Sequence, residues 1–250
     1  MAGHSHWANI QRSKGAADSK RGKVFSKLSR YIMIAARNGG GDPDMNLKLR
    51  YAIDKARAVS MPKENIERAI KKGTGELEGE TLEELTYEGY GHGGVAIIVE
   101  ATTDNRARSS GEIRKIFERA GGKMGQPGSV AWMFERKGVI VVDAKTIDED
   151  KLMEIALEGG AEDIRRAGAN FEVICDAASF HTVQTALAGK KVATLNAELT
   201  QLPKTPTDVS IEDARKVLNL MENLDEHDDV QNVYSTMNLT DEIVAAANAG

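Results

Sequence analysis

Eight Lys or Arg residues lie within the first 38 residues of the chain, against a single acidic residue, Asp18. Trp7, one of two tryptophans, lies in the same stretch. Clustered cations suit the phosphate backbone of a nucleic acid, and a tryptophan can stack on an unpaired base. The candidate nucleic-acid-binding residues are Trp7, Arg12, Lys14, Lys20, Arg21, Lys23, Lys27, Arg30 and Arg37.

Residues 22–38 have the periodicity of a helix, and residues 1–21 lack it and are expected to form a mobile basic arm. At roughly 100° per residue, four of the cations share one side of this helix. These are Lys23, Lys27, Arg30 and Arg37. Val24, Leu28, Tyr31, Ile32 and Ala35 lie on the opposite side. We predict that the cations face phosphate, with an ordinary solvated face as the alternative. Replacing Lys23, Lys27 and Arg30 by Glu should then abolish binding without unfolding the protein.

The charge of the chain is divided unevenly. The net charge of −5 arises from +10 over residues 1–75 and −15 over residues 76–250. Such asymmetry indicates a basic module that meets a polyanion, joined to an acidic body. No apolar run approaches the roughly 20 residues that span a bilayer, so no membrane partner is expected. The one cysteine, Cys175, lies in the apolar run FEVICD and is expected in a core, in a reducing cytoplasm.

Secondary-structure patterns predict how the chain is divided. Three helices follow one another up to residue 73, the second opened by Asp42-Pro43-Asp44. A β-β-α-β pattern over 82–135 lacks a closing helix and strand, which residues 211–225 and 230–239 can supply. Between them, 136–206 shows the alternation of a ferredoxin-like domain. The sequence therefore predicts an α+β fold. Its domains are an arm plus three-helix module (1–76), a discontinuous ferredoxin-like domain (77–135 and 207–240) and an inserted ferredoxin-like domain (136–206).

Two glycine-rich segments require interpretation. The cluster at 89–94 leads into a strand instead of opening a helix, so it is read as a hairpin turn and not as a phosphate-binding loop. The segment GGKMGQPGS (121–129) precedes an expected strand, VAWMFE. It is either a plain helix-to-strand turn or a projecting loop that carries Lys123, Met124 and Gln126 to a partner.

No catalytic arrangement is predicted. The five histidines are scattered, and no Ser/His/Asp, Cys/His or metal-ligand grouping emerges, so we expect neither catalytic residues, a metal, a cofactor nor a small-molecule substrate. An acidic run lacks the pattern of a calcium-binding loop and is read as a solvated helix end. Its members are Glu222, Asp225, Glu226, Asp228 and Asp229.

Many separate blocks of the sequence, in order along nearly the whole chain, resemble the YebC/PmpR family. They are MAGHSHWANIQ, KRGKVFSKL, GGGDPDMN, MPKENIERAIKKG, YEGYGHGG, TDNRARSSGEIRKIF, GGKMGQPGSVAWMFE, ALEGGAED and DDVQNVY. The resemblance implies a helical bundle plus two ferredoxin-like domains, with no known catalysis or cofactor. The family motif begins at Met1, so we expect a bacterial cytoplasmic protein.

The resemblance implies two possible functions. Some family members are described as DNA-binding transcriptional regulators, and others resemble ribosome-associated factors that help translate difficult sequences such as proline runs. We favour the second, a non-enzymatic factor that binds ribosomal RNA. DNA binding stays as the alternative, although the third helix offers only a weak set of base-reading side chains. The sequence does not define the oligomeric state, and a monomer fits it.

Overall fold

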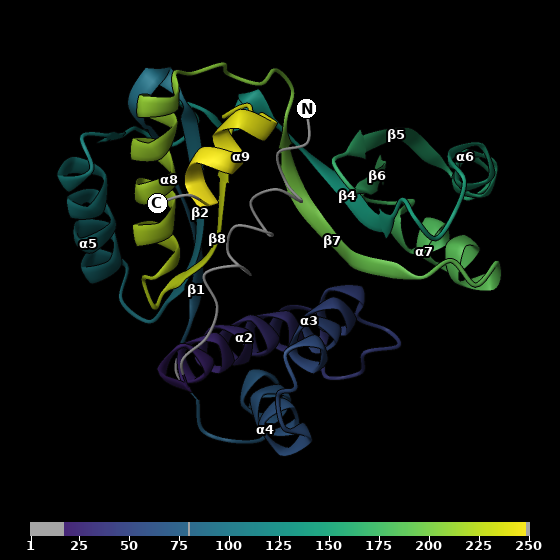
Figure 1. Cartoon of the computed structure of the whole chain (residues 1–250). Helices are drawn as coiled ribbons and strands as arrows, with labels where there is room; N and C mark the ends of the chain where they lie inside the picture. The colour runs from purple at the N-terminus through teal and green to yellow at the C-terminus, as the bar shows by residue number, and fades with distance from the viewer. Residues whose placement is uncertain (1–17, 80, 249–250) are drawn as a thin grey trace.

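The computed structural model describes residues 18–79 and 81–248. Three parts are arranged around one another: a helical module and two sheet domains, joined by the long strands β4 and β7 (Figure 1). No helix in the described ranges is long and apolar enough to cross a membrane.

The N-terminal module consists of three helices, as predicted, but the first begins at Asp18, inside the stretch 1–21 that was expected to form an arm. They are α2 (Asp18–Gly39), α3 (Leu47–Ala58) and α4 (Lys63–Thr74). Their apolar faces form a common core that includes Ile32, Leu49 and Ile66. Gly73 allows α4 to lie directly on α2, because a Cβ at this position would overlap the carbonyl oxygen of Met33.

The second helix begins later than predicted. Residues 42–45 form a turn, and α3 starts at Leu47 because Asn46 caps it: the Asn46 side chain accepts a hydrogen bond from the Leu49 backbone N–H at 3.1 Å. The same side chain donates to the backbone carbonyl groups of Ala35 and Gly40, at 2.7 and 2.8 Å. One buried asparagine therefore both starts α3 and fixes the end of α2.

The first sheet is built from two distant parts of the chain. Its elements are β1 (Glu83–Tyr90), β2 (Ala96–Thr103), α5 (Arg106–Arg119), β3 (Lys123–Met124), α8 (Ile211–Asp225) and β8 (Val230–Ser235). The strand order is β3-β1-β2-β8, with antiparallel neighbours. The predicted return of the chain, through a late helix and strand, is therefore confirmed.

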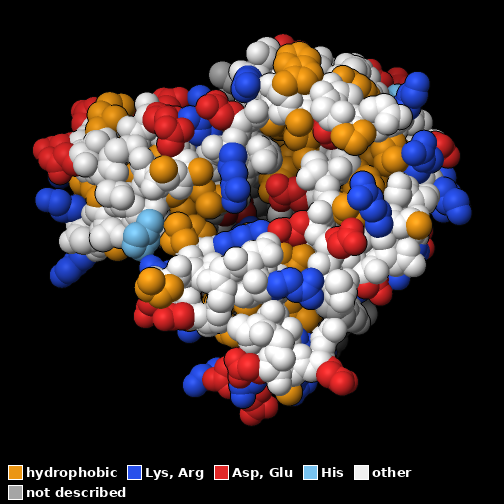
Figure 2. Space-filling model, turned by 180° about the vertical axis from the view of Figure 1, so that it is seen from behind, with side chains coloured by type: hydrophobic (Ala, Val, Ile, Leu, Met, Phe, Trp, Pro, Cys, Tyr) orange, Lys and Arg blue, Asp and Glu red, His pale blue; other side chains and the backbone are white. Residues whose placement is uncertain are grey.

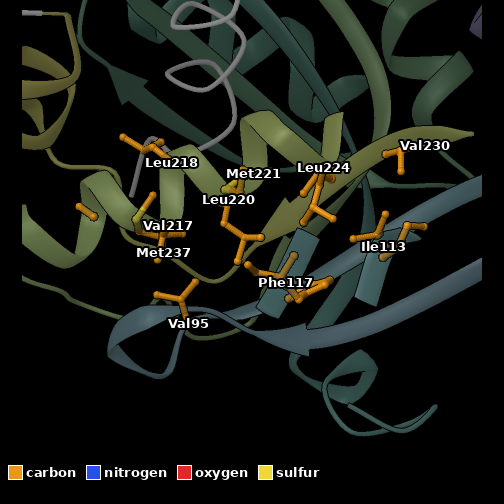
Figure 3. Close-up of a cluster of buried hydrophobic side chains, with 14 of the residues drawn as sticks. Val95, Ile113, Phe117, Val217, Leu218, Leu220, Met221, Leu224, Val230 and Met237 are labelled. Atoms are coloured by element: carbon orange, nitrogen blue, oxygen red, sulfur yellow. The ribbon is translucent and has the colours of Figure 1, made fainter. Parts of the chain in front are cut away.

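One hydrophobic core joins these distant segments. Phe117 and Ile113 of α5 are fully buried against Leu220 and Leu224 of α8 (Figure 3). Burial of side chains of this size stabilises the fold by about 1.5–3 kcal/mol each. Helix α9 (Asp241–Asn248), which the sequence analysis did not predict, adds Ile243 to the same core.

The second sheet forms the inserted domain. Its elements are β4 (Phe134–Asp143), α6 (Glu149–Glu158), β5 (Ala161–Ala167), β6 (Asn170–Asp176), α7 (Phe180–Gly189) and β7 (Thr194–Pro203). The order β5-β6-β4-β7, antiparallel throughout, is that of a ferredoxin-like domain. Helices α6 and α7 supply Leu152, Phe180 and Leu187 to its core.

Two strand predictions need correction. The expected strand VAWMFE does not form: Ala131–Met133 is a single 3-10 turn, and Phe134 already begins β4 of the second sheet. The strand that pairs with β1 is instead Lys123–Met124, inside the glycine-rich segment. Strand β5 was not predicted, because its residues are mostly polar.

Candidate nucleic-acid interface

Three of the four cations that the sequence places on one side of α2 lie against the acidic turn, which we define as residues 225–229, the last residue of α8 and the four that follow it. Arg30 Nη1 is 2.7 Å from Asp229 Oδ1 and donates to the Asp228 carbonyl oxygen at 3.1 Å. Lys27 donates to the Asp225 carbonyl oxygen, and its Nζ lies 3.7 Å from the Asp225 carboxylate. Lys23 Nζ is 3.7 Å from Asp228, and both of these side chains are largely exposed.

Asp229 is the centre of this contact. Its side chain is 2% exposed, and Oδ2 accepts hydrogen bonds from Ser109 at 2.5 Å, Arg108 at 2.9 Å and Thr103 at 3.0 Å, while Oδ1 faces Arg30. Burial alone would raise the Asp229 pKa, but the hydrogen bonds from Ser109, Arg108 and Thr103 outweigh it and lower that pKa to about 2. The interpretation of the acidic run as a solvated helix end is therefore wrong for Asp229, which joins α2 to α5.

The neighbouring Lys27–Asp225 pair behaves differently. Burial lowers the pKa of Lys27 and raises that of Asp225, although their mutual attraction opposes both shifts. Because desolvation offsets much of the Coulomb attraction, such a pair contributes orientation more than stability. Arg37, at the far end of the helix, donates to the Leu82 carbonyl oxygen at 2.9 Å.

These contacts decide what the cations of α2 can do. In this structure Lys27 and Arg30 bind the protein's own carboxylates, while Lys23 stays largely exposed. Replacing all three by Glu would bring like charges together at the acidic turn and disturb the packing of α2. Loss of binding in that variant would therefore not show that these side chains contact the nucleic acid. Trp7, Arg12 and Lys14 lie outside the described residues. Lys20 and Arg21 lie near the start of α2, and their side chains are likewise outside the description.

Helix α3 attaches the module to the inserted domain. The ring of Tyr51 meets that of Phe180 edge-on, with centroids 5.2 Å apart, and Lys55 Nζ is 3.2 Å from Glu198 Oε2. Figure 2 shows a hollow where the parts of the molecule meet, with both basic and acidic side chains at its rim. The module is therefore held by both sheet domains and carries a mixed-charge boundary.

The glycine-rich segment 121–129 is fixed by a buried carboxylate. Glu88 of β1 is 6% exposed and accepts hydrogen bonds from the backbone N–H groups of Gly128, Val130 and Ala131, at 2.6, 2.6 and 2.8 Å. Burial would raise the Glu88 pKa, but these three bonds lower it. Gly128, with φ of +85°, has the left-handed backbone conformation with which the loop turns its N–H groups toward the Glu88 carboxylate. The segment is thus an anchored loop.

Not all the predicted loop residues are presented outward. Lys123 and Gln126 are exposed, whereas Met124 is half-buried and packs against the core of the first sheet. Lys123 and Met124 also pair with Tyr90 and Gly89 as strand β3. A substitution of Met124 would therefore disturb packing as well as any partner contact.

Two aromatic side chains flank the anchored loop, and sequence reasoning missed both. Trp132 is 66% exposed and Tyr90 is 37% exposed. Trp132 Nε1 and the Tyr90 hydroxyl both donate to the Ser129 carbonyl oxygen, each at 3.1 Å. An exposed tryptophan held in place beside a loop is a platform on which a nucleic-acid base can stack. Trp132 was assigned to a strand, where its outward orientation could not be read from the sequence.

The described residues contain no group of three or more His, Cys, Asp or Glu residues that could hold a metal ion. Cys175 is fully buried, and burial raises its thiol pKa to about 11, which confirms it as a core residue and not a nucleophile.

The three-part α+β fold is shared by proteins that carry the name of probable transcriptional regulators. Family models match residues 5–76 as the TACO1/YebC protein N-terminal domain and residues 82–237 as the TACO1/YebC second and third domain. The chain therefore belongs to the TACO1/YebC family, as the sequence resemblance indicated.

Individual relatives support this assignment along the whole chain. A protein of Desulfatibacillum aliphaticivorans, named "Probable transcriptional regulatory protein", is 53% identical over 98% of this chain and 99% of its own length. One of the same name from Dictyoglomus turgidum is 52% identical over 98% of both chains. The crystal structure of a conserved hypothetical protein from Aquifex aeolicus matches with a TM-score of 0.81 and 45% identity, over 90% of this chain and 93% of the other.

Proposed function

We propose that this protein is a non-enzymatic, RNA-binding regulator that associates with the ribosome in the cytoplasm and assists translation of difficult sequences such as proline runs. The observation that carries the proposal is the anchored loop with its flanking aromatic residues. Trp132 and Tyr90 offer stacking surfaces, and Lys123 and Gln126 are exposed beside them. Unstacked bases are typical of RNA loops and ends, and aromatic stacking is a common means of binding them.

The basic arm and the start of α2 would supply the electrostatic contribution. We assign phosphate contacts to Arg12, Lys14, Lys20 and Arg21, with Trp7 stacking on a base and the exposed Lys23 extending the row. Lys27 and Arg30 would support nucleic-acid binding indirectly. Their contacts with the acidic turn hold α2 in a fixed orientation relative to the first-sheet domain, which carries the anchored loop. Arg37 would act in the same way through its bond to Leu82.

DNA binding is the second candidate, and the names of the relatives favour it. A recognition helix would have to present base-reading side chains to the major groove. Helix α4 is the exposed candidate, but its outer face mixes Glu64 and Glu67 with Arg68 and Lys71. This face offers only a weak set of side chains for reading base edges, so we rank sequence-specific DNA readout below RNA binding.

Sedimentation with ribosomes, alongside DNA binding over a salt series, separates the two functions. We expect co-sedimentation with ribosomes, and DNA binding that is non-specific and weakens with salt by about −0.9 in log–log slope per phosphate contact. Absence from the ribosome pellet, together with salt-resistant preference for particular DNA sites, would instead establish a transcriptional regulator.

A further inference from the structure

A cavity of about 190 Å³ lies at the edge of the first sheet, between α5, β1 and the anchored loop. Its walls are Leu85–Glu88 of β1, the α5 side chains Arg106, Ser110 and Arg114, and the loop residues Met124–Pro127. The cavity exists because β3 pairs only with Gly89 and Tyr90, which leaves the start of β1 without a neighbouring strand on that side among the described residues.

The charges of this cavity favour an anion. Arg106, Ser110 and Arg114 are spaced four residues apart and therefore form a row along one side of α5, about 12 Å long. Both arginines are exposed, and neither forms an ion pair or hydrogen bond with any other described residue, in contrast to Arg108, which is bound to Asp229 and Asp104. The one carboxylate in the cavity wall is Glu88, and its oxygens are occupied by three backbone N–H groups.

A second observation points to a missing partner. Tyr87 lines the cavity, and its hydroxyl oxygen is buried without a hydrogen-bond partner among the described residues. Buried hydroxyl groups are usually hydrogen-bonded, so an orphan needs an explanation. Arg106 is close enough to Tyr87 to influence its ionisation electrostatically. Two guanidinium groups and a serine hydroxyl therefore line this space, and the Tyr87 hydroxyl lies buried within its wall.

We propose that this cavity binds a phosphate group of a single-stranded RNA. Guanidinium groups bind phosphate through paired, charge-assisted hydrogen bonds, and the hydroxyl group of Ser110 can donate to a remaining oxygen. The cavity wall includes Gln126 and Pro127 of the anchored loop, so a strand held here would run along that loop. This inference deepens the proposed function and rests on it only for the identity of the strand as RNA.

The test uses the full-length protein and two substitutions of matched size at Ser110. Ser110→Glu places a carboxylate four residues from each arginine, where it can pair with both while supporting the helix. Ser110→Gln has nearly the same shape without the charge. Inorganic phosphate is titrated first, with the arginine side-chain N–H signals followed by NMR, and then an eight-nucleotide oligouridylate, with affinity measured by fluorescence anisotropy.

We expect phosphate to shift the signals of Arg106 and Arg114, and Ser110→Glu to weaken oligouridylate binding at least tenfold relative to Ser110→Gln, because two charge-assisted contacts are lost. Arg119→Gln, on the same helix but outside the cavity, should bind like wild type. Equal affinity of the Glu and Gln variants would overturn the proposal, as would binding of inorganic phosphate without any binding of oligouridylate.

The outcome is separable from that of the ribosome experiment. If the wild type binds oligouridylate through this cavity but does not sediment with ribosomes, the cavity assignment stands and the translational role fails. If it sediments with ribosomes but Ser110→Glu leaves oligouridylate binding unchanged, the role stands and the cavity assignment fails.

Discussion

Replacement of Asp229 by Asn is expected to lower the free energy of unfolding by about 3 kcal/mol, because it removes a buried negative charge while the cations of Arg30 and Arg108 remain. Ser109 and Thr103 also lose a charged acceptor. For a protein of this size the change corresponds to a fall in melting temperature of roughly 6–12 °C. Thermal unfolding followed by circular dichroism measures it. Proteolysis between α4 and β1 should accelerate as well, because the helical module is released from the acidic turn.

Asp228→Asn is the matched control, one residue away. The Asp228 side chain is 68% exposed, and its ion pair with Lys23 is long, at 3.7 Å. The expected change in the free energy of unfolding is therefore within about 0.5 kcal/mol. Equal melting of the two variants would show that the Asp229 network does not hold the module in place.

The depressed pKa of Asp229 also predicts a pH dependence. Its folded-state pKa of about 2 lies below the ordinary value of 3.8, so its stabilising contribution is complete above about pH 4. That contribution is lost as the pH falls toward 2. Wild type should therefore lose stability more steeply than Asp229→Asn over this range, and parallel curves would contradict the assignment.

Replacement of Glu88 by Gln is expected to cost about 2–4 kcal/mol and to loosen the anchored loop. The carboxylate accepts three backbone N–H groups, whereas an amide offers one oxygen and directs its own N–H donors at those groups. Hydrogen exchange at the backbone amides of residues 128–131 should accelerate markedly, and mass spectrometry of peptides from this segment measures the change.

Glu84→Gln provides the comparison on the same face of the same strand. Glu84 is exposed and pairs with Lys48 at 2.6 Å, so its loss should cost less than about 1 kcal/mol and leave exchange in the loop unchanged. Unaltered loop exchange in Glu88→Gln would mean that other contacts shape the loop.

Elements with a clear local pattern could be predicted from the sequence. The period of the apolar residues in 211–225 matches α8 residue for residue, and Ser210 caps it by accepting from the Asp213 backbone N–H. The return of this helix and of β8 to the first sheet also followed from the pattern, because 82–135 lacked the elements that complete a ferredoxin-like domain.

Elements whose shape depends on distant contacts could not be predicted. Strand β5 is an edge strand that carries Glu162, Asp163, Arg165 and Arg166. Charged residues protect an exposed edge from aggregation, but they also remove the hydrophobic pattern by which a strand is predicted. The strand expected over 130–135 fails because Glu88 draws the backbone of Val130 and Ala131 into a turn.

The same limit applies to the candidate site. Periodicity correctly places cations on one side of α2, but the partner of Arg30 lies 199 residues later in the chain, at Asp229. No local signal connects the two. The exposure of Trp132 and the cavity beside Arg106 likewise arise only when α5, β1 and the loop are brought together.

The most direct measurement attaches a hydroxyl-radical-generating iron chelate to Gln126→Cys and maps cleavage of ribosomal RNA in purified complexes. The native Cys175 is buried with a raised pKa, so the new thiol alone would be labelled. We predict cleavage confined to a few neighbouring positions of ribosomal RNA, absent or displaced when the chelate is attached to Glu154→Cys on α6. No cleavage above that of unlabelled protein, or a pattern identical to that of the α6 variant, would contradict the placement of the anchored loop against ribosomal RNA.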